Sequence, residues 1–136
     1  MKSRIASFAA LALLAALACT PAAQAGELYV FCNSGVTLQA GDLRDVFMGE
    51  KQFAGAVKLQ PADNSASQAA FLDKILKMDA GKYATTWTKK SFRDGVNPPP
   101  TKGTDAEAVE YAKRTPGGCS YSGSEPGGGV TVVAKL

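Results

Sequence analysis

The chain has 136 residues, contains no histidine, and carries 15 lysines and arginines against 12 acidic residues, a formal net charge of +3. Without histidine it cannot form a Ser-His-Asp or Cys-His catalytic set, and zinc would lack its commonest nitrogen ligand. The sequence therefore predicts a protein that is not an enzyme and that holds neither a metal nor a cofactor.

The first 25 residues are typical of a cleaved secretory signal peptide. Lys2 and Arg4 precede an apolar run over residues 5–18, and Ala23-Gln24-Ala25 is a small-x-small site that signal peptidase accepts. The apolar run is shorter than the roughly 20 residues of a spanning helix. We therefore expect residues 26–136 to be exported to the periplasm or the medium as one domain with no membrane span.

Cleavage also changes the charge, because two basic residues leave with the signal. The 15 basic residues fall to 13 against 12 acidic ones, a net charge of +1, which gives no support for a nucleic-acid partner. An alternative cleavage lies before Cys19, which would then carry a lipid anchor as in bacterial lipoproteins. Such sites usually have leucine three positions before the cysteine, where this chain has Ala16, so cleavage after Ala25 is favoured.

Short strands and helices are predicted along the first half of the domain. They are a strand over residues 27–32, a helix over 40–48, a second strand over 57–60 and a capped helix over 65–78. Asn33-Ser34-Gly35 is the turn after the first strand. Ser65 to Gln68 fits a capping box at the start of the last helix.

The second half continues with a helix over residues 79–93, a proline loop over 94–100 and a helix over 104–114. Two strands follow, over residues 119–122 and 130–133. Three consecutive prolines cannot continue a helix, and Thr104 to Glu107 is a second capping box. Strands that alternate with helices predict an α/β domain, with a short, mostly parallel sheet covered by helices on both faces.

Two cysteines remain after cleavage, Cys32 and Cys119, near opposite ends of the domain. An even number of cysteines in an exported domain indicates a disulfide. The bridge requires that the two strands be neighbours in the sheet. If they are not, both residues are separate buried thiols.

Three short segments, in order along the chain, match motifs of one known family. They are Leu43 to Gly49 (LRDVFMG), residues 57–67 followed by Phe71, and Thr115 to Tyr121 (TPGGCSY). These segments resemble L-R-x-I-F-x-G, D-G-S-G-T and T-P-G-A-I-G-Y in the phosphate-binding proteins of ABC importers. The resemblance covers residues 28–123 and implies one lobe of the type 2 periplasmic-binding fold, as in small single-lobe relatives of that family.

The resemblance also implies an oxyanion site at the start of the helix near Ser65. By this resemblance Ser65 and Ser67 donate hydroxyl groups, and Asp63 accepts a hydrogen bond from a protonated oxyanion. Asn64 lies in the same loop, in place of a glycine of the family. Ser34, after the first strand, would face the same crevice. A helix N-terminus suits this chemistry because its amides are unpaired.

The implied function is non-catalytic binding of phosphate or another small oxyanion or solute, with a membrane permease as a further partner. Two structural interpretations without ligand binding stay open: Ser65 serves only as a helix cap, and Asn33-Ser34-Gly35 is only a turn. In the alternative function, the chain is a ligand-free structural or interaction module that docks an envelope or secretion partner. The candidate docking elements are the proline loop, Pro98–Pro100, and a basic cluster that consists of Lys89, Lys90 and Arg93.

Overall fold

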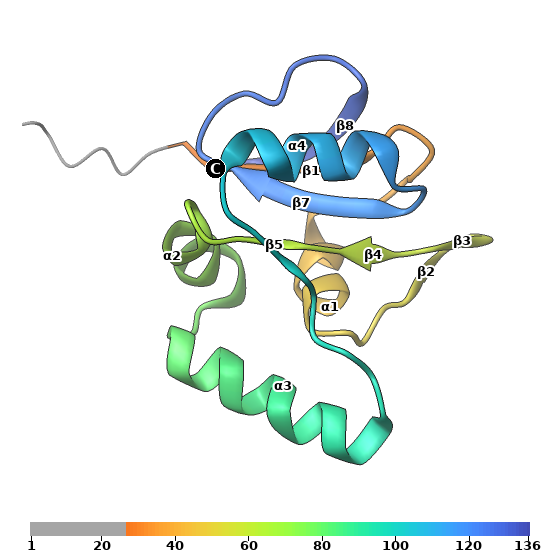
Figure 1. Ribbon diagram of the computed structural model, residues 1–136. Helices are drawn as coiled ribbons and strands as arrows, with labels where there is room; N and C mark the ends of the chain where they lie inside the picture. Colours follow the sequence, from red (N-terminus) through yellow and green to blue (C-terminus); the bar gives the residue numbers. More distant parts are fainter. Residues whose placement is uncertain (1–26) are drawn as a thin grey trace, which may run out of the picture.

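The computed structural model describes residues 27–136. The expected signal peptide and the alternative lipid site at Cys19 lie outside these residues. Within the described range, no helix is long and apolar enough to cross a membrane. Figure 1 shows this part of the chain as a small sheet with helices on either side of it.

A four-stranded sheet with the order β4-β7-β1-β8 forms the centre of the fold. Its strands are β1 (Tyr29–Asn33), β4 (Gln60–Pro61), β7 (Gly118–Ser122) and β8 (Val130–Lys135). Strand β1 is antiparallel to both β7 and β8, whereas β4 is parallel to β7. Two further two-stranded sheets are present. Strand β2 (Phe53–Ala54) pairs with β3 (Val57–Lys58) in the antiparallel direction, and β5 (Asp63–Asn64) pairs with β6 (Thr101–Lys102) in the parallel direction.

The predicted α/β class is confirmed, but the strand directions correct the expectation of a mostly parallel sheet. Both neighbours of the central strand β1 are antiparallel to it. Alternating strands and helices predict parallel pairing only where a helix joins strands that are neighbours in the sheet. Here the neighbours of β1 are β7 and β8, the last two strands, which the chain reaches only after all of its helices.

Helices cover both faces of the sheet, as Figure 1 shows. Helix α4 (Asp105–Arg114) lies over one face, where its two buried alanines pack against Tyr29 and Phe31 of β1. The other face carries the remaining helices and short turns: η1 (Ala40–Asp42), α1 (Leu43–Phe47), α2 (Gln68–Phe71), the π turn η2 (Leu72–Leu76) and α3 (Ala80–Asp94).

The larger core is built around three aromatic rings beneath the sheet. Phe71 of α2 stacks on Tyr121 of β7 with ring centroids 4.1 Å apart, and Phe47 of α1 lies 4.6 Å from Phe71. All three rings are fully buried. Such pairs add about 0.5–1.5 kcal/mol each to the free energy of burial. The rings therefore join the first two helices to the sheet.

Cys32 and Cys119 form the expected disulfide. The two residues lie directly opposite each other on β1 and β7, with Cα atoms 4.0 Å apart. Both are fully buried. The condition set by the sequence, that their strands be neighbours, is met.

Two helices begin where the sequence predicts them to begin. The Thr104 hydroxyl accepts a hydrogen bond from the Glu107 N–H at 3.1 Å, which caps α4. The Asp79 carboxylate accepts one from the Lys82 N–H at 2.7 Å, which caps α3. Each side chain satisfies a first-turn amide that has no partner inside its helix.

Candidate functional site

The structure brings four of the five predicted ligand residues together and separates the fifth. The four lie on β5 and in the turn before α2, close to the start of α4: Asp63, Asn64, Ser65 and Ser67. Ser34 lies in the exposed turn after β1, where the neighbouring Asn33 side chain donates to the Ala112 carbonyl at the end of α4 (3.0 Å). Helix α4 has ten residues, about 15 Å, so Ser34 does not face the same crevice.

Asp63 is buried and accepts two hydrogen bonds from tyrosines. The Tyr83 hydroxyl of α3 donates to Oδ2 at 2.7 Å, and the Tyr121 hydroxyl of β7 donates to Oδ1 at 2.8 Å. Burial raises the pKa of the Asp63 carboxyl above its usual range, although the two hydroxyls act in the opposite direction. Burial also raises the pKa of both tyrosines, which therefore stay protonated donors.

Asn64 and Ser67 are bound to Asp105, at the start of α4. The Asn64 side-chain amide donates to Asp105 Oδ1 at 2.7 Å and to the Tyr121 carbonyl at 2.8 Å. The Ser67 hydroxyl donates to the same Asp105 oxygen at 2.9 Å. Asn64 is fully buried, so these contacts satisfy a side chain that has no access to water.

The helix predicted to begin at Ser65 begins instead at Gln68, so the capping box is wrong. Ser65 is held in the β5–β6 pairing, where its N–H donates to the Lys102 carbonyl at 2.9 Å and its hydroxyl to the same carbonyl at 3.2 Å. Ser67 is the N-cap residue, but its side chain accepts no first-turn amide. The pairing partner β6 lies over 30 residues away in sequence, so the local spacing of residues around Ser65 could not predict this pairing.

This cluster is poorly suited to hold an anion through its side chains. The hydroxyl and amide groups of Asn64, Ser65 and Ser67 already donate to protein acceptors. The Asp105 carboxylate is one of these acceptors, and a second carboxylate, the buried Asp63, directly precedes Asn64 on β5. An oxyanion here would have to displace internal hydrogen bonds and meet a negative charge.

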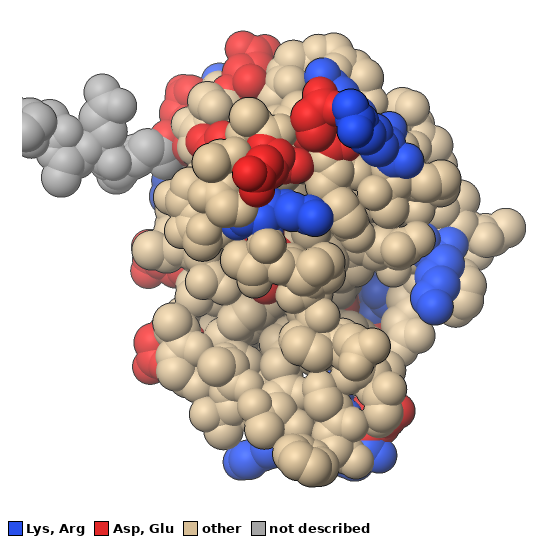
Figure 2. Space-filling view, in the orientation of Figure 1, with Lys and Arg blue, Asp and Glu red and all other residues tan. Residues whose placement is uncertain are grey.

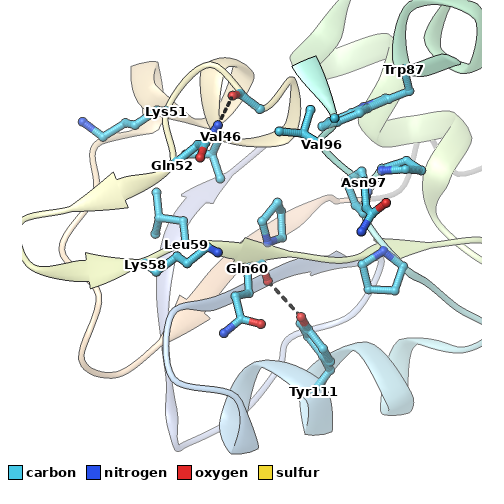
Figure 3. Close-up of a pocket in the computed structure, with 16 residues that line it drawn as sticks. Val46, Lys51, Gln52, Lys58, Leu59, Gln60, Trp87, Val96, Asn97 and Tyr111 are labelled. Atoms are coloured by element: carbon cyan, nitrogen blue, oxygen red, sulfur yellow. Dashed lines mark hydrogen bonds between the residues drawn. The ribbon is translucent and has the colours of Figure 1, made fainter. Parts of the chain in front are cut away.

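A groove of about 460 Å³ runs along the outer edge of β4. Its lining comes from the segment after α1, from β3 and β4, and from the loop after α3, with Trp87 of α3 and Tyr111 of α4 at its two sides. Figure 3 shows Leu59 and Gln60 on one wall and Val96 and Asn97 on the opposite wall. In the space-filling view, a hollow separates the surface over α4 from the surface over α3 (Figure 2).

The groove exists because two neighbouring segments diverge. Residues 63–64 pair with residues 101–102 as β5 and β6, and the Asp63 N–H donates to the Pro100 carbonyl at 2.7 Å. Before that point the second segment contains three prolines, Pro98 to Pro100, which have no N–H to donate to β4. The edge of β4 therefore stays without a strand partner along the groove.

The groove combines flat apolar walls with basic and amide groups. None of the described residues that line it is acidic. The two lining cations are Lys58, for which residues 27–136 provide no ion pair, and Lys51, 3.8 Å from the Asp42 carboxylate. The Tyr111 hydroxyl donates to the Gln60 carbonyl at 3.2 Å, and burial raises the pKa of this tyrosine. This arrangement offers ammonium and amide donors to a small anion.

Two aromatic residues of α3, one turn apart, contact the groove and Asp63 respectively. Trp87 lines the groove and is only 5% exposed, and its indole N–H makes no regular hydrogen bond within the described chain. The Tyr83 hydroxyl, one turn earlier in α3, donates to Asp63. Both aromatic residues, Tyr83 and Trp87, belong to the larger core.

The chain is similar to the crystal structure of PstS from Borrelia burgdorferi, with a TM-score of 0.51 and 14% sequence identity. The match covers 71% of this chain and 40% of that one. The chain has a periplasmic-binding-like fold. At this identity the likeness shows the fold alone, and no family model or curated protein matches the sequence.

The sequence did not reveal the groove residues, because they come from two regions that are far apart along the chain. One region lies between Val46 and Pro61, and the other consists of residues 95–100 with Trp87 and Tyr111 beside them. One local signal was present, since Pro61 and the three prolines Pro98 to Pro100 cannot donate to a sheet ladder. That signal indicates an unpaired edge, but it does not indicate which segments face each other across it.

Proposed function

We propose that this chain is an exported, non-catalytic binding module that holds a small anionic solute in the groove along β4. The fold is that of a protein class that binds solutes, as the similarity to PstS supports. The buried Cys32–Cys119 disulfide supports the interpretation that the protein functions in an oxidising compartment outside the cytoplasm. A membrane permease or another envelope protein would receive the solute.

The observation that carries the proposal is a contrast in charge between two places. The cluster around Ser65 contains two carboxylates, and its side-chain donors are already used. The groove has two lysines and no acidic residue among its described lining, and Lys58 is exposed to an incoming ligand. Its volume of about 460 Å³ falls within the range of roughly 300–1,000 Å³ that small-molecule sites occupy.

The two walls suggest which part of the solute each would contact. Trp87, Val96 and the prolines offer flat apolar surfaces, which favour a planar or aliphatic body. Lys58, Gln52 and Asn97 offer donors at the rim, which favour a carboxylate or phosphate group. We therefore expect benzoate to bind more tightly than inorganic phosphate, since it has both parts.

Chemical-shift mapping tests the location. Inorganic phosphate and benzoate are titrated separately into the ¹⁵N-labelled chain at neutral pH. We expect saturable shifts at Lys58, Gln60 and Asn97, stronger with benzoate. Shifts centred on Ser65 to Ser67 would instead support the oxyanion site implied by the sequence, and the absence of saturable shifts with either ligand would end the groove proposal.

A matched pair of lysine variants tests the contact itself. Lys58→Ala removes the lysine that has no ion partner in the described chain, and a hydrogen bond to a charged group is worth about 1.5–3 kcal/mol. We expect benzoate affinity to fall about tenfold or more, measured by calorimetry. Lys82→Ala removes another exposed lysine, on the outward side of α3, and should leave the affinity unchanged. Equal losses in both variants would indicate a general charge effect.

A further inference from the structure

The outward face of α3 carries an exposed aromatic ring beside a row of basic side chains. Phe92 is 89% exposed, the highest value among the large hydrophobic residues that lie at the described surface. Lys82, Lys89 and Arg93 are seven and four residues apart, so a helix of 3.6 residues per turn places them along one side. Phe92 follows Lys89 by three residues and therefore lies next to this row.

The side of α3 that holds the helix to the protein lies opposite Phe92 and about a quarter of a turn from the basic row. Its buried residues are Tyr83, Trp87 and Lys90. The Tyr83 hydroxyl donates to Asp63, and the Lys90 ammonium forms an ion pair of 2.9 Å with Glu50. In Figure 1, α3 is the outermost helix beneath the sheet, and no other element of the described chain covers its outward face.

The charges on this face differ from those of the predicted docking cluster. Lys90 was expected to be part of that cluster, but it is 7% exposed and points inward. Lys82 and Lys89 are exposed, and no ion pair to either is found between residues 27 and 136. Arg93 is held by the adjacent Asp94 at 2.9 Å. Figure 2 shows basic side chains on the underside of the molecule, where α3 lies.

We propose that this face of α3, defined by Lys82, Lys89 and Phe92, docks a partner protein with an acidic surface around an apolar pocket. Phe92 enters the pocket, and the two lysines contact carboxylates at its rim. Central aromatic anchors surrounded by charge pairs are the usual pattern of binding hot spots. The docking face and the groove lie on different surfaces, so one chain can hold a solute and a partner together.

The charge of this face argues against two other binding partners, a second copy of the chain and an anionic membrane. A second copy would bring one basic row against another, which repels. An anionic membrane would gain only about 1 kcal/mol for each lysine near its surface, and one phenylalanine adds little apolar area. A protein with complementary carboxylates offers both a pocket for the ring and fixed partners for the lysines.

Site-specific photocrosslinking tests the proposal in cells that produce this chain. The full chain carries p-benzoylphenylalanine in place of Phe92 or, as a matched control, in place of Phe53, which is 55% exposed on β2. We expect a light-dependent adduct with one protein from position 92 and none from position 53. A lipid adduct, an adduct between two copies, or no adduct at position 92 would overturn the proposal.

The purified partner then tests the chemistry. Phe92→Ala and the double variant Lys82→Glu/Lys89→Glu should each weaken binding at least tenfold, and reversal of the contacted acids in the partner should restore binding to the double variant. Phe53→Ala and Lys58→Ala should leave the affinity unchanged, which separates docking from solute capture. Wild-type affinity in the Phe92 and lysine variants would overturn the proposal.

Discussion

Asp63 joins two layers of the molecule through one buried carboxylate. A buried charge is costly unless it is hydrogen-bonded, and Asp63 is only 3% exposed. Its two oxygens accept from Tyr83 on α3 and Tyr121 on β7, so each oxygen is satisfied by a different element. The carboxylate therefore positions α3, and with α3 the Trp87 wall of the groove.

The raised pKa of Asp63 predicts a pH dependence of stability. Because the pKa is higher in the folded than in the unfolded chain, this residue's stabilising contribution is complete below the ordinary pKa of an aspartate. It is lost as the pH rises through the raised value, and a pKa difference of one corresponds to about 1.4 kcal/mol. The unfolding free energy of the wild type should therefore fall, relative to Asp63→Asn, as the pH rises from acid to neutral.

Urea denaturation at a series of pH values measures this difference. Asp45→Asn, which changes an exposed carboxylate on α1, is the control and should track the wild type across the series. If the wild type gained stability over Asp63→Asn with rising pH, the direction assigned to the Asp63 pKa would be wrong.

Strand β4 depends on a close backbone approach that only glycine permits. Gly117 has φ +76°, and a Cβ atom there would lie 1.9 Å from the Lys58 carbonyl oxygen. The Gly117 carbonyl accepts from the Gln60 N–H at 2.8 Å, so this contact registers β4 against β7. The floor of the groove therefore depends on a residue that does not itself offer a side chain to a ligand.

Gly117→Ala should separate β4 from β7. The left-handed backbone alone costs an alanine about 1–2 kcal/mol, and the overlap with Lys58 adds to that. Gly127→Ala is the matched control, because Gly127 has φ +77° and open space around the position of a Cβ atom. Thermal unfolding should show a larger loss at position 117 than at 127, and benzoate binding should be lost only at 117. Equal losses at both positions would contradict the steric argument.

Local signals predicted the elements better than they predicted the pairings. Thr104 caps α4 as expected, and α3 begins at the predicted place with Asp79 as its cap, since a helix start needs only three or four residues of sequence. The start of α2, the direction of the sheet and the groove were not predictable in this way. Each depends on a contact between distant segments, such as Ser65 with Lys102 or Gln60 with Gly117. The cysteine pairing was predictable because the sequence offers only two cysteines after the expected signal peptide.

The described chain is small, and its sheet is only four strands wide. Its two cores lie on opposite faces of that sheet, and the second consists of only Tyr29, Phe31 and two alanines of α4 with their neighbours. A domain of this size has a net stability of roughly 5–15 kcal/mol. A cross-link between the central strands therefore contributes a large part of the whole.

The Cys32–Cys119 bridge closes a loop of 87 residues and restricts the unfolded chain. The chain-entropy model gives about 4–5 kcal/mol for a loop of this length. Reduction, or the double variant Cys32→Ala/Cys119→Ala, should lower the unfolding free energy by several kcal/mol, measured by urea denaturation with and without reductant. The double variant should be insensitive to reductant, which separates loss of the bridge from other effects. Because the strand ladder between β1 and β7 persists without the bridge, the variant should still fold, but with a small margin. An unchanged urea midpoint on reduction would show that the domain does not need an oxidising compartment and would weaken the case for export.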